Sequence, residues 1–266
     1  MRKPFLTLIL TFVVGLPMVA RADSLWIGTD NTSVRAVLNT DLAGNLIQSV
    51  PNTEATGIAV DLASNLIYIG IAENGGQITS RNLATPGTTV STINPNPPLV
   101  FGEDMAFDGT SLWRVDISGN TVDKIDPITG AILSLFNPGF SEPLGVAWDG
   151  SNLWVSQFTG NGIVEQFTPS GVPTGQSFNA PLGGSTAGGL AFDTTDKTLF
   201  IGTFGNVFHT TTSGALLGSF ALPVNDGRFV DGLEFQGTSA VPEPSSIVLL
   251  GAALLWIARS SYKKLG

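Results

Sequence analysis

A short apolar pattern recurs along the middle of the chain at nearly constant spacing. It is a pentapeptide of mostly small and apolar residues that usually ends in aspartate, with five copies: Gly57–Asp61, Asp104–Asp108, Gly145–Asp149, Gly189–Asp193 and Gly232–Gln236. Successive copies start 47, 41, 44 and 43 residues apart. Repeats of about 40–50 residues that consist of short strands are typical of β-propeller blades.

Further strands are expected after each pentapeptide. After four of them comes a turn and then a second strand with an aromatic residue near its start, at Tyr68, Trp113, Trp154 and Phe200. Trp26 occupies the same position in a matching strand at the start of the repeat region. A third and a fourth strand follow, for example residues 121–125 and 132–136, with turn residues between them. No helical periodicity competes within this region, so the sequence predicts an all-β fold.

The two ends of the repeat region complement each other. Leu25–Ile27 matches a second strand that no pentapeptide precedes, and Gly232–Gln236 is a pentapeptide that no second strand follows. If these segments paired, they would complete a fifth blade and remove two exposed sheet edges. We therefore predict a five-bladed β-propeller over residues 23–238. An irregular blade around Asn94–Gly102 would make six.

The repeat resembles those of the NHL, YVTN and gluconolactonase-like propellers over residues 24–236, a resemblance that supports a fold more than a function. Residues that recur in each unit are expected to serve the blade. The pentapeptide aspartates should form turns, and the second-strand aromatics should pack between blades. These aspartates are Asp61, Asp108, Asp149 and Asp193.

Other acids depart from the repeat, and they are Glu103, Asp104, Asp231 and Glu234. If the innermost strands line a central channel, these carboxylates could converge there and hold Ca²⁺ through oxygen ligands. Solvated acids at the rim are the alternative, and the full ligand set of gluconolactonase-like propellers is not matched. Arg114 replaces an apolar residue of the repeat and is expected to pair with an acid such as Asp116 or Asp104.

Composition excludes several kinds of site. The 266 residues include no cysteine and one histidine, His209, so disulfides, cysteine-ligated metals and multi-histidine centres are absent. His209 is expected to be an ordinary half-buried residue of a third strand. No nucleophile elbow or phosphate loop is present, and the formal net charge of −9 argues against a nucleic-acid partner.

The first 22 residues have the order of a secretory signal peptide. Basic residues precede an apolar run over 5–19, and Ala20-Arg21-Ala22 follows. Cleavage after Ala22 would leave Asp23 as the first mature residue, after export through the Sec translocon. An uncleaved membrane anchor is the alternative, although the run is short for a membrane span.

The last residues, 239–266, form a second targeting signal. They contain Val241-Pro242-Glu243-Pro244, then an apolar stretch, Ile247–Ala258, and then the cations Arg259, Lys263 and Lys264. This order resembles the PEP-CTERM sorting signal of Gram-negative bacteria that make extracellular polysaccharide. The resemblance implies a transient inner-membrane helix and processing near the motif by an exosortase, a membrane protease. An ordinary tail anchor with a Pro-rich linker is the alternative.

These segments change the meaning of the composition. Part of the mean hydropathy of +0.27 belongs to the two ends. Six of the 12 cations but only one of the 21 acids lie outside residues 23–240, which leaves that body with a formal charge of −14. We expect an exported, non-enzymatic binding or structural protein of the cell surface or extracellular matrix, associated with exopolysaccharide or surface proteins. A metal-dependent propeller hydrolase or lactonase is the alternative.

Overall fold

The computed structural model describes residues 23–29, 36–51, 53–159, 162–223 and 228–237. They belong to one compact unit, Ala22–Gly237. Both expected targeting segments lie outside the described residues, and with them Ala20, Ala22, the motif Val241–Pro244 and the cations Arg259, Lys263 and Lys264. Within the described ranges, no helix is long and apolar enough to cross a membrane.

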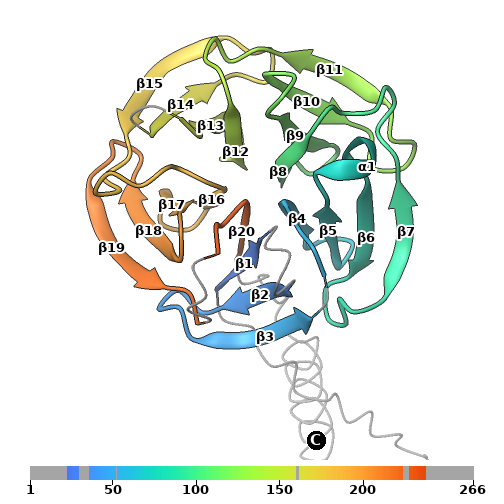
Figure 1. Cartoon of the computed structure of the whole chain (residues 1–266), viewed down its shortest axis with the longest axis horizontal. Coiled ribbons are helices and arrows are strands. Elements are labelled where there is room, and N and C mark those ends of the chain that lie inside the picture. Colours follow the sequence, from blue (N-terminus) through green and yellow to red (C-terminus); the bar gives the residue numbers. More distant parts are fainter. Residues whose placement is uncertain (1–22, 30–35, 52, 160–161, 224–227, 238–266) are drawn as a thin grey trace, which may run out of the picture. The chain divides into compact units, whose positions relative to one another are not determined.

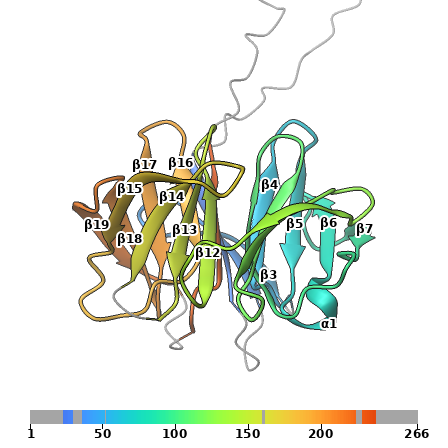
Figure 2. The same ribbon diagram turned by 90° about the horizontal axis from the view of Figure 1, so that it is seen from above.

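Five four-stranded antiparallel sheets surround a central axis as the blades of a propeller (Figure 1). Figure 2 shows the blades from the side, with strands running along the axis. The innermost strands are β4 (Gly57–Asp61), β8 (Gly102–Phe107), β12 (Pro143–Trp148), β16 (Leu190–Asp193) and β20 (Gly232–Gln236). The second strands are β1 (Ser24–Gly28), β5 (Leu66–Gly70), β9 (Leu112–Asp116), β13 (Leu153–Gln157) and β17 (Thr198–Gly202).

The outer half of each blade has the same regular order. The third strands are β2 (Ala36–Thr40), β6 (Ile78–Asn82), β10 (Thr121–Ile125), β14 (Ile163–Phe167) and β18 (Asn206–Thr211). The outermost strands are β3 (Leu46–Pro51), β7 (Thr89–Ile93), β11 (Ile132–Phe136), β15 (Pro173–Asn179) and β19 (Leu216–Ala221). The short segment α1 (Glu73–Gly76) has positive φ at three of its four residues and is a turn rather than a regular helix.

The predicted five-bladed, all-β propeller is confirmed. The alternative sixth blade is not formed, because residues 94–101 connect β7 to β8 with only an isolated bridge between Asn96 and Ala131. The innermost strands coincide with the five pentapeptides to within a few residues. The period of the repeat therefore locates every blade.

The fifth blade closes the ring with strands from both ends of the repeat region. β20 pairs with β1 in the antiparallel register that places Trp26 opposite Glu234. The indole Nε1 of Trp26 donates a buried hydrogen bond of 2.7 Å to Oε1 of Gln236. Gln236 stands where the other pentapeptides have aspartate, and Trp113 Nε1 likewise donates to Asp108. The closing blade therefore repeats, across the two chain segments, a bond made locally elsewhere.

The second-strand aromatics are all buried and pack between neighbouring blades, as expected. Trp113, for example, lies in one apolar cluster with Val146 and Leu153 of the next blade. Trp26 does the same across the closure, against Ile58 and Ile67. Each large ring fully removed from water contributes about 2–3 kcal/mol to folding. The aromatic therefore supplies the joint between consecutive blades.

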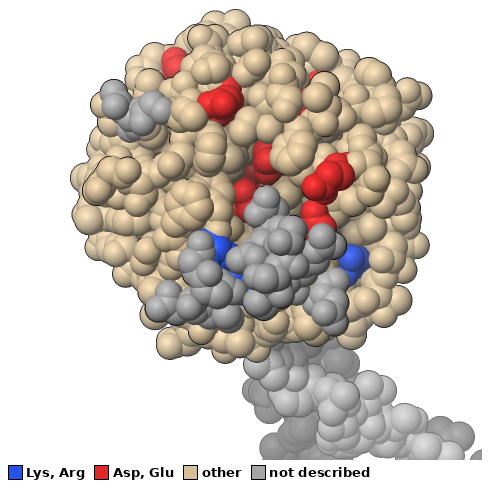
Figure 3. Space-filling view, in the orientation of Figure 1, with Lys and Arg blue, Asp and Glu red and all other residues tan. Residues whose placement is uncertain are grey.

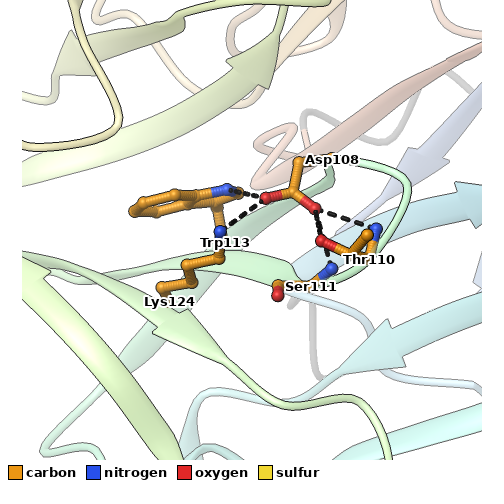
Figure 4. Close-up of polar contacts among 5 residues, drawn as sticks. All are labelled: Asp108, Thr110, Ser111, Trp113 and Lys124. Atoms are coloured by element: carbon orange, nitrogen blue, oxygen red, sulfur yellow. Dashed lines mark hydrogen bonds and ion pairs between the residues drawn. The ribbon is translucent and has the colours of Figure 1, made fainter.

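The pentapeptide aspartates form the turns after the innermost strands, as expected. Asp108 accepts the backbone N–H groups of Thr110 and Ser111 through one carboxylate oxygen (Figure 4). Its other oxygen lies 2.9 Å from Trp113 Nε1 and 3.0 Å from Lys124 Nζ. Asp61, Asp149 and Asp193 also accept turn N–H groups. These carboxylates replace backbone acceptors that a tight turn lacks.

Replacing Gln236 with alanine should weaken the ring closure. The change leaves Trp26 Nε1 buried without its acceptor, which we expect to lower the free energy of unfolding by about 1–3 kcal/mol. Urea-induced unfolding followed by tryptophan fluorescence would measure this loss. Gln176→Ala, at an exposed position of β15, is the matched control. Equal stability of the two variants would contradict a role for this bond in closure.

The Asp108 cluster should make stability depend on acid pH. Burial raises the pKa of Asp108, but the bonds from Thr110, Lys124 and Ser111 outweigh it and lower the pKa to about 2. A carboxyl with a lowered folded-state pKa stabilises the fold above its unfolded pKa, near 4, and loses that contribution as pH falls toward 2. Asp108→Asn should therefore flatten the fall in melting temperature between pH 4 and pH 2, measured by circular dichroism.

Asp149→Asn provides the comparison for this experiment. Asp149 occupies the same position in the next blade, but its side-chain partner is the uncharged Gln166, at 2.6 Å. We expect the acid slope to change less in this variant, because no lysine partner is lost. An unchanged slope in Asp108→Asn would contradict the ion-pair explanation.

Candidate functional site

The four acids predicted to converge in the channel fall into two pairs. Asp104 on β8 and Glu234 on β20 lie at the axis, where they accept N–H groups of the innermost strands. Glu103 and Asp231 instead line a depression at the end where β8, β12 and β20 begin. The four carboxylates are therefore not gathered at a single site.

Asp104 links four of the five blades. Its side chain is completely buried. One oxygen accepts the N–H groups of Met105 and Leu233, at 2.9 and 3.1 Å. The other accepts those of Val146 and Leu190, at 3.2 and 2.8 Å. These donors belong to β8, β20, β12 and β16, whose inner edges have no neighbouring strand. One carboxylate thus satisfies amides that would otherwise be buried without an acceptor.

Glu234 accepts a backbone N–H group from the remaining blade. Its carboxyl group accepts the N–H of Val60 on β4. Burial, and then the charge of Asp104, raise the pKa of Glu234 well above its usual range. Burial also raises the pKa of Asp104, although four amide donors act against this. Because Asp104 has four donors and Glu234 one, we assign the negative charge to Asp104 and the proton to Glu234 at neutral pH.

A β-bulge brings Asp104 to the axis. The register between β8 and β9 shifts between Gly102 and Met105, so Glu103 and Asp104 have no partner residue on β9. A bulge breaks the regular alternation of faces and redirects the side chains that it carries. The sequence identified both acids as departures from the repeat. It could not show that the bulge gives them different environments.

Among the described residues Arg114 makes no direct ion pair with a carboxylate, contrary to the sequence-based expectation, although the charges of Glu103, Asp116 and Asp104 act on it. Its buried guanidinium donates to the backbone carbonyls of Glu103, Gly102, Ile71 and Gly76 and to Thr56 Oγ1. The expected partners are engaged elsewhere, because Asp104 accepts four amides and Asp116 accepts those of Val100, Phe101 and Gly119. Burial lowers the pKa of Arg114 to about 10. Arg114 therefore links the blade of β8 to the blade of β4 through carbonyl groups.

The described residues do not assemble a metal site from these acids. In this part of the chain, no group of three or more His, Asp or Glu side chains is placed to hold a metal ion. Asp104, the most central of the four, directs both oxygens to amide donors. In this arrangement the axial acids accept backbone N–H groups from the inner strand edges, and they do not converge as ligands of one Ca²⁺ ion.

The best candidate for a binding site is the depression lined by Glu103 and Asp231, which we call the axial depression. It has a volume of about 860 Å³, within the range of small-ligand sites. Two innermost strands, β8 and β12, contribute to it, together with three connections between second and third strands and the segments that lead into β8, β12 and β20. Its lining residues are Phe101, Glu103, Ile117, Ser118, Asn120, Ser141, Glu142, Leu144, Phe158, Phe204, Phe229 and Asp231.

Aromatic rings form one wall of the axial depression. The rings of Phe204 and Phe229 have centroids 4.7 Å apart, and Phe158 meets Phe229 edge-on at 5.5 Å. Phe204 is 53% exposed, which is unusual for so large an apolar side chain. These three rings were not among the site residues predicted from the sequence. Ile117, Phe158 and Phe204 follow the second strand at equivalent positions of three units, a recurrence that could have identified them.

The axial depression is also acidic, because carboxylates line it beside the aromatic rings. Acidic side chains gather near the centre of the propeller in Figure 3, and cations are sparse there. Glu103, Glu142 and Asp231 line the axial depression, and the described residues that line it include no lysine or arginine. His209 lies far from this lining in sequence and fold, on β18, where it stacks on Phe200 with centroids 4.2 Å apart. It is half-buried, as expected.

Comparison with known proteins supports the fold and leaves the function open. No family model and no curated protein matches the sequence. By contrast, 1077 solved chains match the structure, so the fold is too widespread to indicate one activity. Among them is a chain in the crystal structure of a nidogen/laminin complex. It matches with a TM-score of 0.54 and 14% identity, over 80% of this chain and 98% of that one. At this identity the likeness shows the fold alone.

Asp104→Asn should strongly destabilise the propeller. The amide nitrogen would replace an acceptor oxygen and oppose two buried N–H groups, so we expect a loss of about 2–5 kcal/mol in the free energy of unfolding. Urea-induced unfolding would measure it, with Asp196→Asn, at an exposed turn, as the control. Wild-type stability of Asp104→Asn would contradict the role assigned to this carboxylate.

Glu234→Gln tests the proton assignment with a variant that should fold. A carboxyl with a raised folded-state pKa contributes stability that is lost as pH rises through that pKa. Glutamine imitates the protonated acid and retains an oxygen for the N–H of Val60. The variant should therefore match the wild type near pH 4 and lose less stability as the pH is raised from there. Parallel pH profiles of melting temperature would contradict the assignment.

Proposed function

We propose that this protein is an exported, non-enzymatic β-propeller that binds a ligand at the cell surface or in the extracellular matrix. The observation that carries the binding role is the axial depression, where exposed aromatic rings and carboxylates occupy one concave surface. Innermost strands contribute to its floor, and connecting segments between strands, which carry Phe158, Phe204 and Phe229, form its wall. Sites of this kind on a rigid scaffold are typical of binding surfaces.

The proposed destination rests on the two ends of the sequence. The basic, apolar and small-residue order of residues 1–22 supports export through the Sec translocon. The motif at Val241–Pro244, the apolar stretch and the terminal cations support sorting by an exosortase-type protease after a transient stay in the inner membrane. The motif follows Gln236, the last residue of the closing strand, by only five residues. Exopolysaccharide or surface proteins are the proposed partners.

A non-enzymatic role is supported by the chemistry that lines the axial depression. Ser118 and Ser141 are the hydroxyl groups there, and the single histidine, on β18, is not available to activate either of them. A metal-dependent hydrolase or lactonase would require several ligands on one ion. The described residues do not bring such a set together.

Glu243→Ala tests the sorting half of this proposal. The change removes the only charge of the motif and leaves both prolines in place. In the native host, we expect the variant to accumulate as a membrane-bound form that retains its C-terminal segment. The measurements are fractionation of cells, matrix and medium, and the mass of the protein in each fraction.

Ser246→Ala is the matched control for this experiment, because it alters the same segment outside the motif. We expect it to be processed and released like the wild type. Unchanged mass and distribution of Glu243→Ala would contradict exosortase-type sorting. That result would favour an ordinary tail anchor.

A further inference from the structure

The axial depression combines an apolar wall with an acidic rim, and this combination restricts what can bind there. Phe204 and Phe229 form the exposed part of the wall, and Phe158 supports Phe229 from the side. Phenylalanine has no polar atom with which to bind a hydroxyl-rich ligand. Its ring face does attract cations, by about 0.5–2 kcal/mol depending on solvent exposure. The wall therefore favours a ligand with both apolar and cationic parts.

The charges around this wall favour a cation as well. Glu103, Glu142 and Asp231 contribute carboxylates, while the nearest cation in sequence, Arg228, is 1% exposed and does not line the depression. Arg114 also lies against Glu103 and partly balances its charge, so two buried arginines stand behind three acids, but only the acids line the depression. Glu103 and Asp231 are each 5% exposed, so the effective dielectric constant around them is lower than that of water and their charges act more strongly. The carboxylates would repel an anionic ligand, and a neutral ligand would gain only the apolar contacts of the wall.

Glu142 is the most accessible of these acids, and its backbone is held in an unfavourable conformation. Its φ is +53°, in the left-handed region that costs a non-glycine residue about 1–2 kcal/mol. Its N–H donates to Asn120 Oδ1 at 2.8 Å, and its carbonyl accepts the N–H of Phe158 at 2.8 Å. Hydrogen bonds to Asn120 and Phe158, on two different connections, thus fix the backbone of Glu142 at the rim. A glycine would satisfy the same backbone without strain, but it would supply no carboxylate.

We propose that the axial depression binds a lysine or arginine side chain presented by a protein partner, an inference that rests on the binding role proposed above. Both side chains have an apolar stem that can lie along phenylalanine rings and a cationic end that can reach carboxylates. A volume of about 860 Å³ accommodates one such side chain with its flanking residues. Among the lining residues there is no tryptophan or tyrosine, the aromatic residues with a polar group for a sugar hydroxyl.

Calorimetric titration of the full-length protein in detergent tests this proposal with defined probes. The first probe is a blocked peptide in which two lysines flank a phenylalanine, and the second is the same peptide with glutamates. A glucosamine hexamer and a cellulose hexamer test cationic and neutral sugars. We expect binding of the lysine peptide alone, with an affinity that falls as salt rises.

Two variants locate the binding, and two others serve as controls. Glu142→Gln and Phe204→Ser should each lower the affinity for the lysine peptide by roughly fivefold. Glu73→Gln removes an exposed acid outside the lining, and Leu216→Ser removes an exposed apolar residue of β19. Both controls should bind the peptide like the wild type. Melting temperatures of all four variants would establish that they remain folded.

The outcomes separate this inference from the proposed function. Binding of the glucosamine hexamer in preference to the peptide would overturn the protein partner, while the surface-binding role would stand. Binding of the lysine peptide that neither Glu142→Gln nor Phe204→Ser weakens would overturn the site. No binding of any probe would also overturn the inference. Failure of the sorting experiment with Glu243→Ala would affect only the proposed destination.

Discussion

The structure depends on how the inner edges of five strands are satisfied where they meet. The innermost strand of each blade has a partner on one side only, so its other edge presents N–H groups to the axis, and burial there without acceptors would be costly. Asp104 accepts one N–H group from each of four blades, and Glu234 accepts one from the fifth. A buried charge is normally unfavourable, and the four amide contacts offset only part of its desolvation. The axial pair therefore links the blades at their centre, in addition to the aromatic joints farther out.

Closure of the ring is the second constraint, and it involves the strand that precedes the predicted C-terminal targeting signal. β20 must return to β1 before the fifth blade exists, so the last folded strand is also the segment from which the C-terminal tail continues. The bond between Trp26 and Gln236 joins residues 210 positions apart in sequence. Pairing over so long a sequence separation carries a large loop-closure entropy, which the contacts of the complete ring must offset.

The rigid centre also explains where a binding surface can develop. Glu103 and Asp104 are neighbours in sequence, yet one lines the axial depression and the other holds strand edges together, because the bulge in β8 separates their environments. Glu142 and Phe204 lie on connections that the strands position but do not need for their own pairing. Such positions are free to carry binding chemistry, whereas the axial acids beneath them serve stability.

The sequence by itself predicted five blades with a sixth left open, the strand order, the closing pair and the turn role of the aspartates, because a local pattern of apolar residues and turns repeats with each blade. It also marked Glu103, Asp104, Asp231 and Glu234 as exceptions to that pattern. Only the tertiary structure decided what these exceptions do. Register shifts, the direction of a side chain at a bulge and the approach of strands about 40 residues apart are absent from a one-dimensional pattern. For the same reason, the carbonyl partners of Arg114 and the aromatic wall of Phe158, Phe204 and Phe229 became visible only when five blades were placed around one axis.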